Sequence, residues 1–179
     1  MTSQSIMSQK EMDRAIARMA YEIVENNKGT DDLVLIGIRT GGVPLAERLS
    51  EKILQIEGKR PPTGILDINL YRDDWSRLTQ HPVVRKTEIP FSIDDKIVIL
   101  VDDVIYTGRT TRAALDALTD LGRPKKIQLA VLVDRGRREL PIQPDFVGLV
   151  VQTSSREHVN VFLQEIAGRD EIIIEKQDR

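Results

Sequence analysis

The chain has 179 residues, of which 40% are hydrophobic and 30% are charged, and its formal net charge is −2. This size and composition indicate one globular domain with a substantial core, and the slightly acidic balance excludes a protein whose whole surface binds nucleic acid. Disulfides and thiolate metal sites are excluded because the sequence contains no cysteine. Its apolar runs are far shorter than the ~20 residues that span a bilayer, and the first ten residues lack the apolar core of a signal peptide. We therefore expect no membrane partner and a cytoplasmic location.

The N-terminus predicts a loose segment followed by a helix. Residues 1–7 are mostly polar and predict a flexible tail. Ser8 and Glu11 form an S-x-x-E capping box, and apolar residues repeat behind it at helical spacing until Gly29, which predicts the helix end.

Two further elements follow around a short loop. The run from Leu33 to Ile38 is apolar at every position, which predicts a strand buried on both faces. Residues 39–42 predict a loop, and residues 43–56 a helix whose first turn tolerates a proline. Residues 64–70 predict the next strand.

Residues 71–95 differ from the rest of the chain, because they are long, polar and without periodicity. Such a segment inside a compact domain is either a lid over a binding site or an insert without a role. We favour the lid because it directly follows the end of a strand.

The second half of the chain again alternates strands with helices, which indicates a parallel α/β sheet with right-handed crossovers. Its predicted elements are a central strand over 96–101, a helix over 110–121 that ends at Gly122, a strand over 127–133, and short strands over 146–152, 159–163 and 171–175 that form a small cap.

The most informative segment runs from Ile99 to Thr111, where an apolar run ends in two adjacent carboxylates, Asp102 and Asp103. Adjacent carboxylates repel each other and gain nothing from packing, so a pair at a strand end indicates a ligand. The pair suits the vicinal hydroxyls of a ribose. It also suits Mg²⁺, which prefers a few carboxylate oxygens and keeps its waters. A capped surface turn is the alternative, and the loop that follows favours the sugar site.

That loop suits a phosphate group. Gly108 lets the backbone approach a ligand closely, and the threonines around it offer hydroxyl donors. The helix that begins near Thr110 directs free N–H groups and the positive end of its dipole at the loop. The chain lacks the G-x-x-x-x-G-K-[ST] and G-x-G-x-x-G patterns, which excludes a P-loop and a dinucleotide-binding turn. Taken alone, the loop fits a plain capped turn better than a phosphate site, because Thr-Gly turns are common.

These residues resemble a known family. The segment from Ile99 to Thr111 is similar to the thirteen-residue phosphoribosyl pyrophosphate (PRPP) motif of type I phosphoribosyltransferases, in which aliphatic residues precede two acids, an aliphatic pair and Thr-Gly-x-Thr. Four other segments are similar to the pyrimidine operon attenuator / uracil phosphoribosyltransferase family: residues 27–29, 70–74, 122–124 and 131–141.

The resemblance extends over residues 8–175 and implies the type I phosphoribosyltransferase fold, a central parallel sheet flanked by helices with a small C-terminal hood region. It implies a single phosphoribosyltransferase domain over residues 8–179, with a flexible lid over 71–95 and a hood over 134–165.

The resemblance also implies a role for each residue of the PRPP motif. Asp102 and Asp103 would bind the ribose hydroxyls of PRPP and help to place Mg²⁺, the implied cofactor. The rest of the motif would complete the PRPP site, and its last five residues would cradle the 5′-phosphate. These motif residues are Val104, Ile105, Tyr106, Thr107, Gly108, Arg109, Thr110 and Thr111.

Other implied site residues lie in three loops. Arg39 and Thr40 would hold the pyrophosphate, in a loop with an unusual peptide geometry. Tyr71 and Arg72 would open the lid and act in catalysis with Arg39, and the hood would face uracil. The implied hood residues are Asp134, Arg135 and Gly136.

Three aromatic residues receive no chemical role. We expect His81 to be a solvated lid residue, His158 to lie at the surface, and Trp75 to pack against a neighbouring subunit.

The family has a second activity, the binding of pyrimidine operon leader RNA on a basic concave dimer face in response to uridine nucleotides. Arg18 and Arg138 match basic positions of that face. The sequence departs from better-known members at Gly41, where they often carry Arg, and at five positions of the RNA face, where fewer cations weaken the binding of phosphates. Those five residues are Ala17, Tyr21, Asn26, Gln143 and Leu149.

We therefore expect a uracil phosphoribosyltransferase that forms UMP and pyrophosphate from uracil and PRPP, as a homodimer or homotetramer. One alternative is an RNA-binding regulator with weak catalysis that senses uridine nucleotides. Another is a phosphoribosyltransferase for a different base, which the hood argues against, because residues 133–136 lack the Lys-then-aromatic arrangement of purine enzymes.

Overall fold

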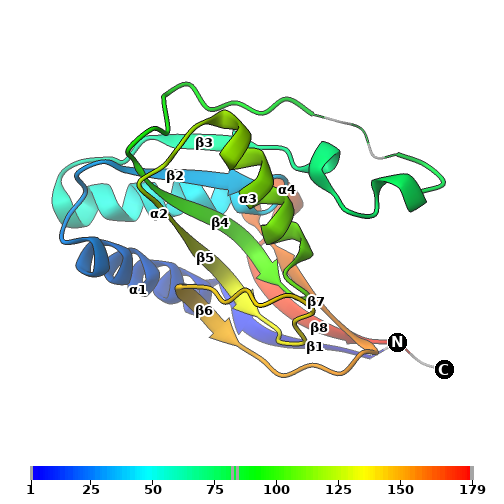
Figure 1. Cartoon of the computed structure of the whole chain (residues 1–179). Helices are drawn as coiled ribbons and strands as arrows, with labels where there is room; N and C mark the ends of the chain where they lie inside the picture. Colours follow the sequence, from blue (N-terminus) through cyan, green and yellow to red (C-terminus); the bar gives the residue numbers. More distant parts are fainter. Residues whose placement is uncertain (1, 82, 84, 178–179) are drawn as a thin grey trace.

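The computed structural model describes residues 2–81, 83 and 85–177, which form two β-sheets and flanking helices (Figure 1). The larger sheet has five parallel strands in the order β3-β2-β4-β5-β6, which confirms the predicted parallel α/β sheet. These strands are β2 (Leu33–Ile38), β3 (Thr63–Leu66), β4 (Ile97–Ile105), β5 (Lys126–Asp134) and β6 (Phe146–Val150). Within the described part of the chain, no helix is long and apolar enough to cross a membrane.

Helices cover both faces of this sheet: α1 (Gln9–Asn27) and α2 (Gly42–Glu57) lie on one side, and α3 (Arg109–Leu121) lies on the other (Figure 1). Successive side chains of a strand point to opposite faces. Leu35 and Ile99 therefore pack with α1 and α2, whereas Ile36 and Leu100 pack with α3. This double burial explains why β2 is apolar at every position and why β4 begins with an unbroken apolar run.

The N-terminal segment confirms one prediction and corrects another. The capping box forms, because Ser8 N donates to Glu11 Oε2 over 2.8 Å and Glu11 N donates to Ser8 Oγ over 3.4 Å. The flexible tail predicted for residues 1–7 is wrong over the described residues, since β1 (Thr2–Ser8) pairs antiparallel with β8 (Glu171–Lys176). The strand is held by backbone pairing with a distant segment and buries only Met7, so its polar sequence gave no sign of it.

The second sheet is antiparallel and has the order β1-β8-β7, with β7 (Glu157–Phe162) joined to β8 through α4 (Gln164–Ala167). The predicted hood over 134–165 is therefore not one unit. Strand β6 falls within that range but extends the large sheet by pairing with β5. The resemblance gave the hood as one range of the chain, which does not specify the sheet that each of its strands joins.

Two predicted strand ends are also wrong. The strand predicted over 64–70 ends at Leu66, because the chain turns into the 3₁₀ segment η1 (Asn69–Tyr71), whose start is fixed by a hydrogen bond from Asn69 N to Asp67 Oδ1 of 3.0 Å. The central strand, predicted over 96–101, continues to Ile105. Aspartate is unfavourable in β-strands. Pairing with β5 nevertheless extends β4 beyond Asp102 and Asp103.

A close approach between backbones joins β2, α2 and β4. A Cβ at Gly42 would overlap the carbonyl oxygen of Val101, and a Cβ at Gly37 would lie 2.5 Å from the carbonyl oxygen of Gly42. Glycine alone leaves room for such contacts. They hold the loop that follows β2 directly against the end of β4 that carries the two acids.

Arg48 of α2 links the large sheet to the segment between β7 and β8. Its guanidinium contacts Asp170 at 2.7 Å and Glu165 at 2.6 Å. The side chain of Arg48 is 17% exposed and that of Asp170 is 5% exposed, so this ion pair is largely removed from solvent. Removing one partner of a buried pair leaves the other charge without compensation.

We predict that Arg48→Ala lowers the free energy of unfolding by about 3 kcal/mol, measured by urea denaturation. Arg60→Ala is the matched control, because Arg60 pairs with Glu47 and Glu51 through side chains that are 44–50% exposed. Exposed pairs contribute less than about 1 kcal/mol. Equal losses in the two variants would contradict the prediction.

Candidate functional site

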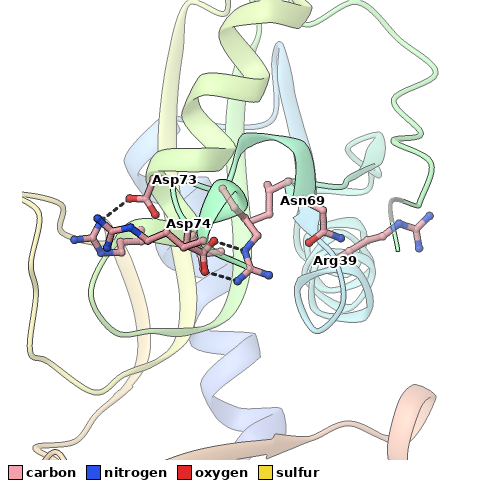
Figure 2. Close-up of a pocket in the computed structure, with 9 residues that line it drawn as sticks. Arg39, Asn69, Asp73 and Asp74 are labelled. Carbon is pink, nitrogen blue, oxygen red and sulfur yellow. Dashed lines mark hydrogen bonds and ion pairs between the residues drawn. The ribbon is translucent and has the colours of Figure 1, made fainter. Parts of the chain in front are cut away.

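The carboxyl ends of β2 and β4 and the first turns of the lid meet at one edge of the large sheet. A cavity of about 790 Å³ opens there. Figure 2 shows Arg39 and Asn69 on one side of it and Asp73 and Asp74 on the other. Four arginines and two aspartates line it, so its lining carries a net positive charge. The lining residues are Arg39, Ile68, Asn69, Arg72, Asp73, Asp74, Arg77, Arg109 and Thr110.

The acid pair lies at the same sheet edge but is not part of that lining. Asp102 is 8% exposed, and its Oδ1 accepts a hydrogen bond of 2.8 Å from Asp103 N. Asp103 is half-buried, and its Oδ1 accepts a 2.8 Å hydrogen bond from Val104 N. Burial and the neighbouring charge of Asp103 raise the pKa of Asp102 well above its ordinary value. The site therefore holds a buried carboxyl group, that of Asp102, which resists ionisation.

The loop after β2 brings the predicted pyrophosphate residues beside these acids. The Arg39–Thr40 peptide bond is cis, which confirms the unusual geometry that the resemblance implied. Arg39 lines the cavity and donates to the carbonyl oxygen of Lys86 from Nε at 3.3 Å and from Nη2 at 3.0 Å. A Cβ at Gly41 would overlap the carboxylate of Asp103. The loop is therefore in direct contact with the acid pair.

The predicted phosphate loop has the expected shape. Gly108 has a φ of 93°, a conformation that favours glycine, and it precedes the first turn of α3. Thr107 Oγ1 accepts a 3.3 Å hydrogen bond from Arg109 N, and Thr107 O accepts one of 2.9 Å from Glu139 N. Gly108 has no side chain to cap α3, and among the described residues the N–H groups of Thr110 and Thr111 have no side-chain acceptor, so they are available to an anion.

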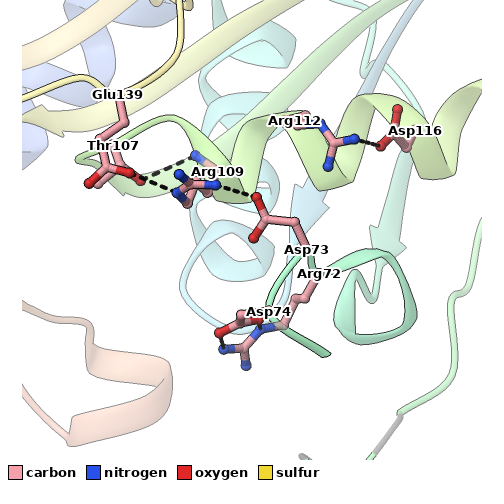
Figure 3. A network of polar contacts seen from close by, with 8 residues as sticks. All are labelled: Arg72, Asp73, Asp74, Thr107, Arg109, Arg112, Asp116 and Glu139. Carbon is pink, nitrogen blue, oxygen red and sulfur yellow. Dashed lines mark hydrogen bonds and ion pairs between the residues drawn. The ribbon is translucent and has the colours of Figure 1, made fainter. Parts of the chain in front are cut away.

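The lid and the phosphate loop are joined by ion pairs. Figure 3 shows Arg109 between Asp73 and Glu139, and its Nε lies 2.8 Å from Glu139 Oε2. Arg72 forms a second pair with Asp74, with contacts of 2.9 and 2.7 Å. Sequence reasoning missed both aspartates, although they directly follow Tyr71-Arg72. The acidic doublet after the basic residue was the one available indication.

Tyr71 takes a different place from the one implied. It is not part of the cavity lining, and its hydroxyl donates a 2.9 Å hydrogen bond to Asp120 Oδ2 of α3. This hydrogen bond raises the pKa of Tyr71, because it favours the protonated phenol. The placement makes Tyr71 an anchor between the lid and α3 rather than a group that faces the cavity.

The implied hood residues are held by contacts within the protein. Arg135 is 6% exposed and donates to Thr153 Oγ1 at 3.1 Å and to the carbonyl oxygen of Glu157 at 2.6 Å. Its guanidinium also lies 3.9 Å from the centre of the Tyr106 ring, in cation–π geometry. Arg135 thus fastens the hood residues to the PRPP motif.

Asp134 is fixed as well. Burial opposes its ionisation, but hydrogen bonds from Arg138 at 2.7 Å and from Gly136 N at 2.9 Å lower its pKa overall.

The two arginines implied in RNA binding have partners inside the protein. Arg18 donates to the carbonyl oxygens of Val147 and Gly148 of β6, at 3.1 and 2.6 Å. The side chain of Arg138 is 14% exposed and also donates to Ile142 O at 2.8 Å. Arg138 thus holds the loop between β5 and β6 through contacts within that loop. Arg18 links α1 to β6, the edge strand of the large sheet.

The lid aromatics pack against each other. The rings of Trp75 and His81 are stacked with their centroids 4.3 Å apart. His81 therefore packs against a lid residue, whereas we expected only contact with solvent. His158 lies exposed on β7, as expected. Two of the lid positions, 82 and 84, lie outside the described residues.

The acid pair fits Mg²⁺ only together with a ligand. Among the described residues no cluster of three or more His, Cys, Asp or Glu could hold a metal by itself. Mg²⁺ is commonly held by one or two carboxylates together with substrate phosphates and water. Asp102 and Asp103 match that donor set when a phosphorylated substrate supplies the remaining oxygens.

The chain belongs to the phosphoribosyl transferase domain family, whose model matches residues 3–165. Its relatives include curated proteins named bifunctional protein PyrR. The one from Pelotomaculum thermopropionicum is 63% identical over 169 residues, which cover 94% of this chain and 93% of that protein. The one from Clostridioides difficile is 56% identical over 171 residues, or 96% and 97% of the two chains.

Solved structures share the fold at much lower identity. A hypoxanthine phosphoribosyl transferase of Trypanosoma cruzi superposes with a TM-score of 0.74 at 19% identity, over 96% of this chain and 90% of that one. This likeness supports the fold and carries no information about the base.

We predict that Asp102→Asn stabilises the protein at pH 7 by about 1–3 kcal/mol while impairing its function. Because the pKa of Asp102 is raised in the folded state above 3.8, its ordinary value, folding takes up a proton. The cost of ionising this buried group therefore grows as pH rises from the ordinary pKa through the raised one.

The gain from Asp102→Asn should accordingly shrink as the pH falls towards about 4. Urea denaturation at several pH values measures it. Asp116→Asn is the control, because its side chain is 50% exposed and its effect should stay within about 0.5 kcal/mol. A destabilised Asp102→Asn variant at pH 7 would contradict the prediction.

Proposed function

We propose that this protein is a uracil phosphoribosyltransferase, which converts uracil and PRPP to UMP and pyrophosphate. One observation carries the proposal. The fold brings the acid pair of the PRPP motif, the phosphate loop at Gly108 and the Arg39–Thr40 loop to one sheet edge, beside an arginine-rich cavity. Relatives at 56–63% identity over more than nine-tenths of this chain support it.

The chemistry requires opposite charges to be stabilised at two places. Displacing pyrophosphate from the anomeric carbon builds positive charge on the ribose ring and negative charge on the leaving group. The carboxylate of Asp103 stabilises the first, and the guanidinium groups of Arg39 and Arg72 stabilise the second. Asp102 and Asp103 would hold Mg²⁺ together with PRPP, and the ion would neutralise further charge on the pyrophosphate.

The lid has two tasks in this reaction. It brings Arg72 to the cavity, and its closure keeps water from the activated sugar, which would otherwise be hydrolysed. Tyr71 supports the lid from outside the cavity through its hydrogen bond to Asp120.

We assign the base as uracil rather than a purine. Residues 133–136 lack the Lys-then-aromatic arrangement of purine enzymes. The side-chain groups of Asp134 and Arg135 are occupied by Arg138, Thr153 and Glu157. This leaves the backbone of the segment to read the polar edge of a small base.

The enzymatic proposal predicts that the purified protein, with Mg²⁺ and PRPP, converts uracil to UMP. Asp103→Asn should lower kcat/KM on the order of 10²-fold, because a group stabilising charge in the transition state is lost. Chromatographic detection of UMP measures both results. Turnover of orotate or hypoxanthine without turnover of uracil would refute the assignment of the base.

A second activity follows from the same relatives, whose name describes them as bifunctional. We propose that the protein also binds pyrimidine operon leader RNA and responds to uridine nucleotides. Arg18 is the basic residue of α1 offered to the RNA, and its side chain is 50% exposed although two carbonyl oxygens hold it. A cytoplasmic location and a homodimer or homotetramer stay predictions.

For RNA binding, we expect a gel shift of the cognate leader RNA at low salt that UMP strengthens. Arg18→Ala should weaken it, and the loss should shrink as salt rises, because phosphate contacts dominate such affinities. Lys52→Ala, on α2, is the charge-matched control. No shift at low salt, with or without UMP, would remove this activity.

A further inference from the structure

We propose that Arg77, in the 3₁₀ turn η2 (Trp75–Arg77) of the lid, is a binding residue for the pyrophosphate group. This inference rests on the proposed function and names a residue that no motif of the sequence indicated.

The arginines of the cavity differ in how far they are engaged. Arg39 donates to Lys86 O, Arg72 pairs with Asp74, and Arg109 pairs with Asp73 and Glu139. Within residues 2–81, 83 and 85–177, Arg77 has no ion-pair or hydrogen-bond partner for its guanidinium. Among the four arginines that line the cavity, Arg77 can therefore bind an anion without first losing a hydrogen-bond acceptor within the described part of the protein.

The loop on the opposite side of the cavity offers little positive charge, because residues 39–42 are Arg-Thr-Gly-Gly. A Cβ at Gly41 would overlap the carboxylate of Asp103, so the loop cannot take a side chain there unless that acid moves. The space next to the cis peptide is thus filled by an acid, and Arg39 is the one cation that residues 39–42 offer to a group with several negative charges.

The turn that carries Arg77 is held in shape by its neighbours. Arg77 N donates to Asp74 O over 2.9 Å, and the Trp75 ring stacks on His81. Asp74 is itself paired with Arg72. The turn that carries Arg77 is therefore held by contacts at Asp74 and at Trp75, and Arg77 lines the same cavity as Arg39. A charged hydrogen bond from this position to a phosphate oxygen would be shorter and stronger than a neutral one.

The test compares two ligands by isothermal titration calorimetry: pyrophosphate with Mg²⁺, and UMP, which lacks the pyrophosphate group. Arg77→Ala should weaken pyrophosphate binding ~10-fold, the usual worth of one charged hydrogen bond, and leave UMP binding within about twofold. Arg77→Lys should restore part of the loss, because it keeps the charge without the fork of donors. Arg85→Ala, on the same lid but outside the cavity lining, should behave as the unmodified protein.

Two results would overturn the inference. One is unchanged pyrophosphate affinity in Arg77→Ala; the other is an equal loss for pyrophosphate and UMP, which would place Arg77 at the 5′-phosphate or in the fold. Turnover of uracil by the unmodified protein separates the two proposals. If uracil reacts and Arg77→Ala binds pyrophosphate normally, only the role of Arg77 fails. If the unmodified protein neither turns over uracil nor binds pyrophosphate, both fail.

Discussion

The contact between the loop after β2 and the end of β4 is the constraint on which the site depends. Gly37 and Gly42 let two backbones approach until no side chain fits between them. As a result the Arg39–Thr40 loop and the acid pair, which are far apart in the chain, share one edge of the sheet. Both faces of that sheet are buried by helices, so the edge at the strand ends is the part left open to a ligand.

Charge within the site is balanced in a way that a phosphorylated ligand would alter. Asp73 neutralises Arg109, which the resemblance assigns to binding PRPP, and Asp74 neutralises Arg72, which it assigns to the lid and to catalysis. Under the proposed function, a phosphate group at the loop of Gly108 would compete with Asp73 for Arg109, and this would couple binding to the start of the lid. Each exposed pair contributes little to stability, so the exchange would require little free energy.

The fold and the substrate are determined by different parts of this molecule. The hypoxanthine enzyme of Trypanosoma cruzi shares the sheet and its helices at 19% identity, which shows that this scaffold does not select the base. Under the proposed function, selection of the base would fall to the hood residues, which contact the PRPP motif through Arg135 and Tyr106. Thr153 and Glu157, before and at the start of β7, accept the hydrogen bonds of Arg135 and so hold these residues in place.

The sequence by itself determined the parallel sheet, the capping box at Ser8 and the acid pair followed by a phosphate loop. Each of these depends on residues that are close together in the chain: apolar runs, a four-residue box and a thirteen-residue motif. The Tyr71 contact with Asp120, the overlap of a side chain at Gly41 with Asp103 and the engagement of Arg18 by β6 join distant segments. So does the pairing of β1 with β8, for which a polar sequence gave no pattern. Only the tertiary structure decided them, because hydrogen-bond partners and close approaches between distant segments leave no periodicity in a single sequence.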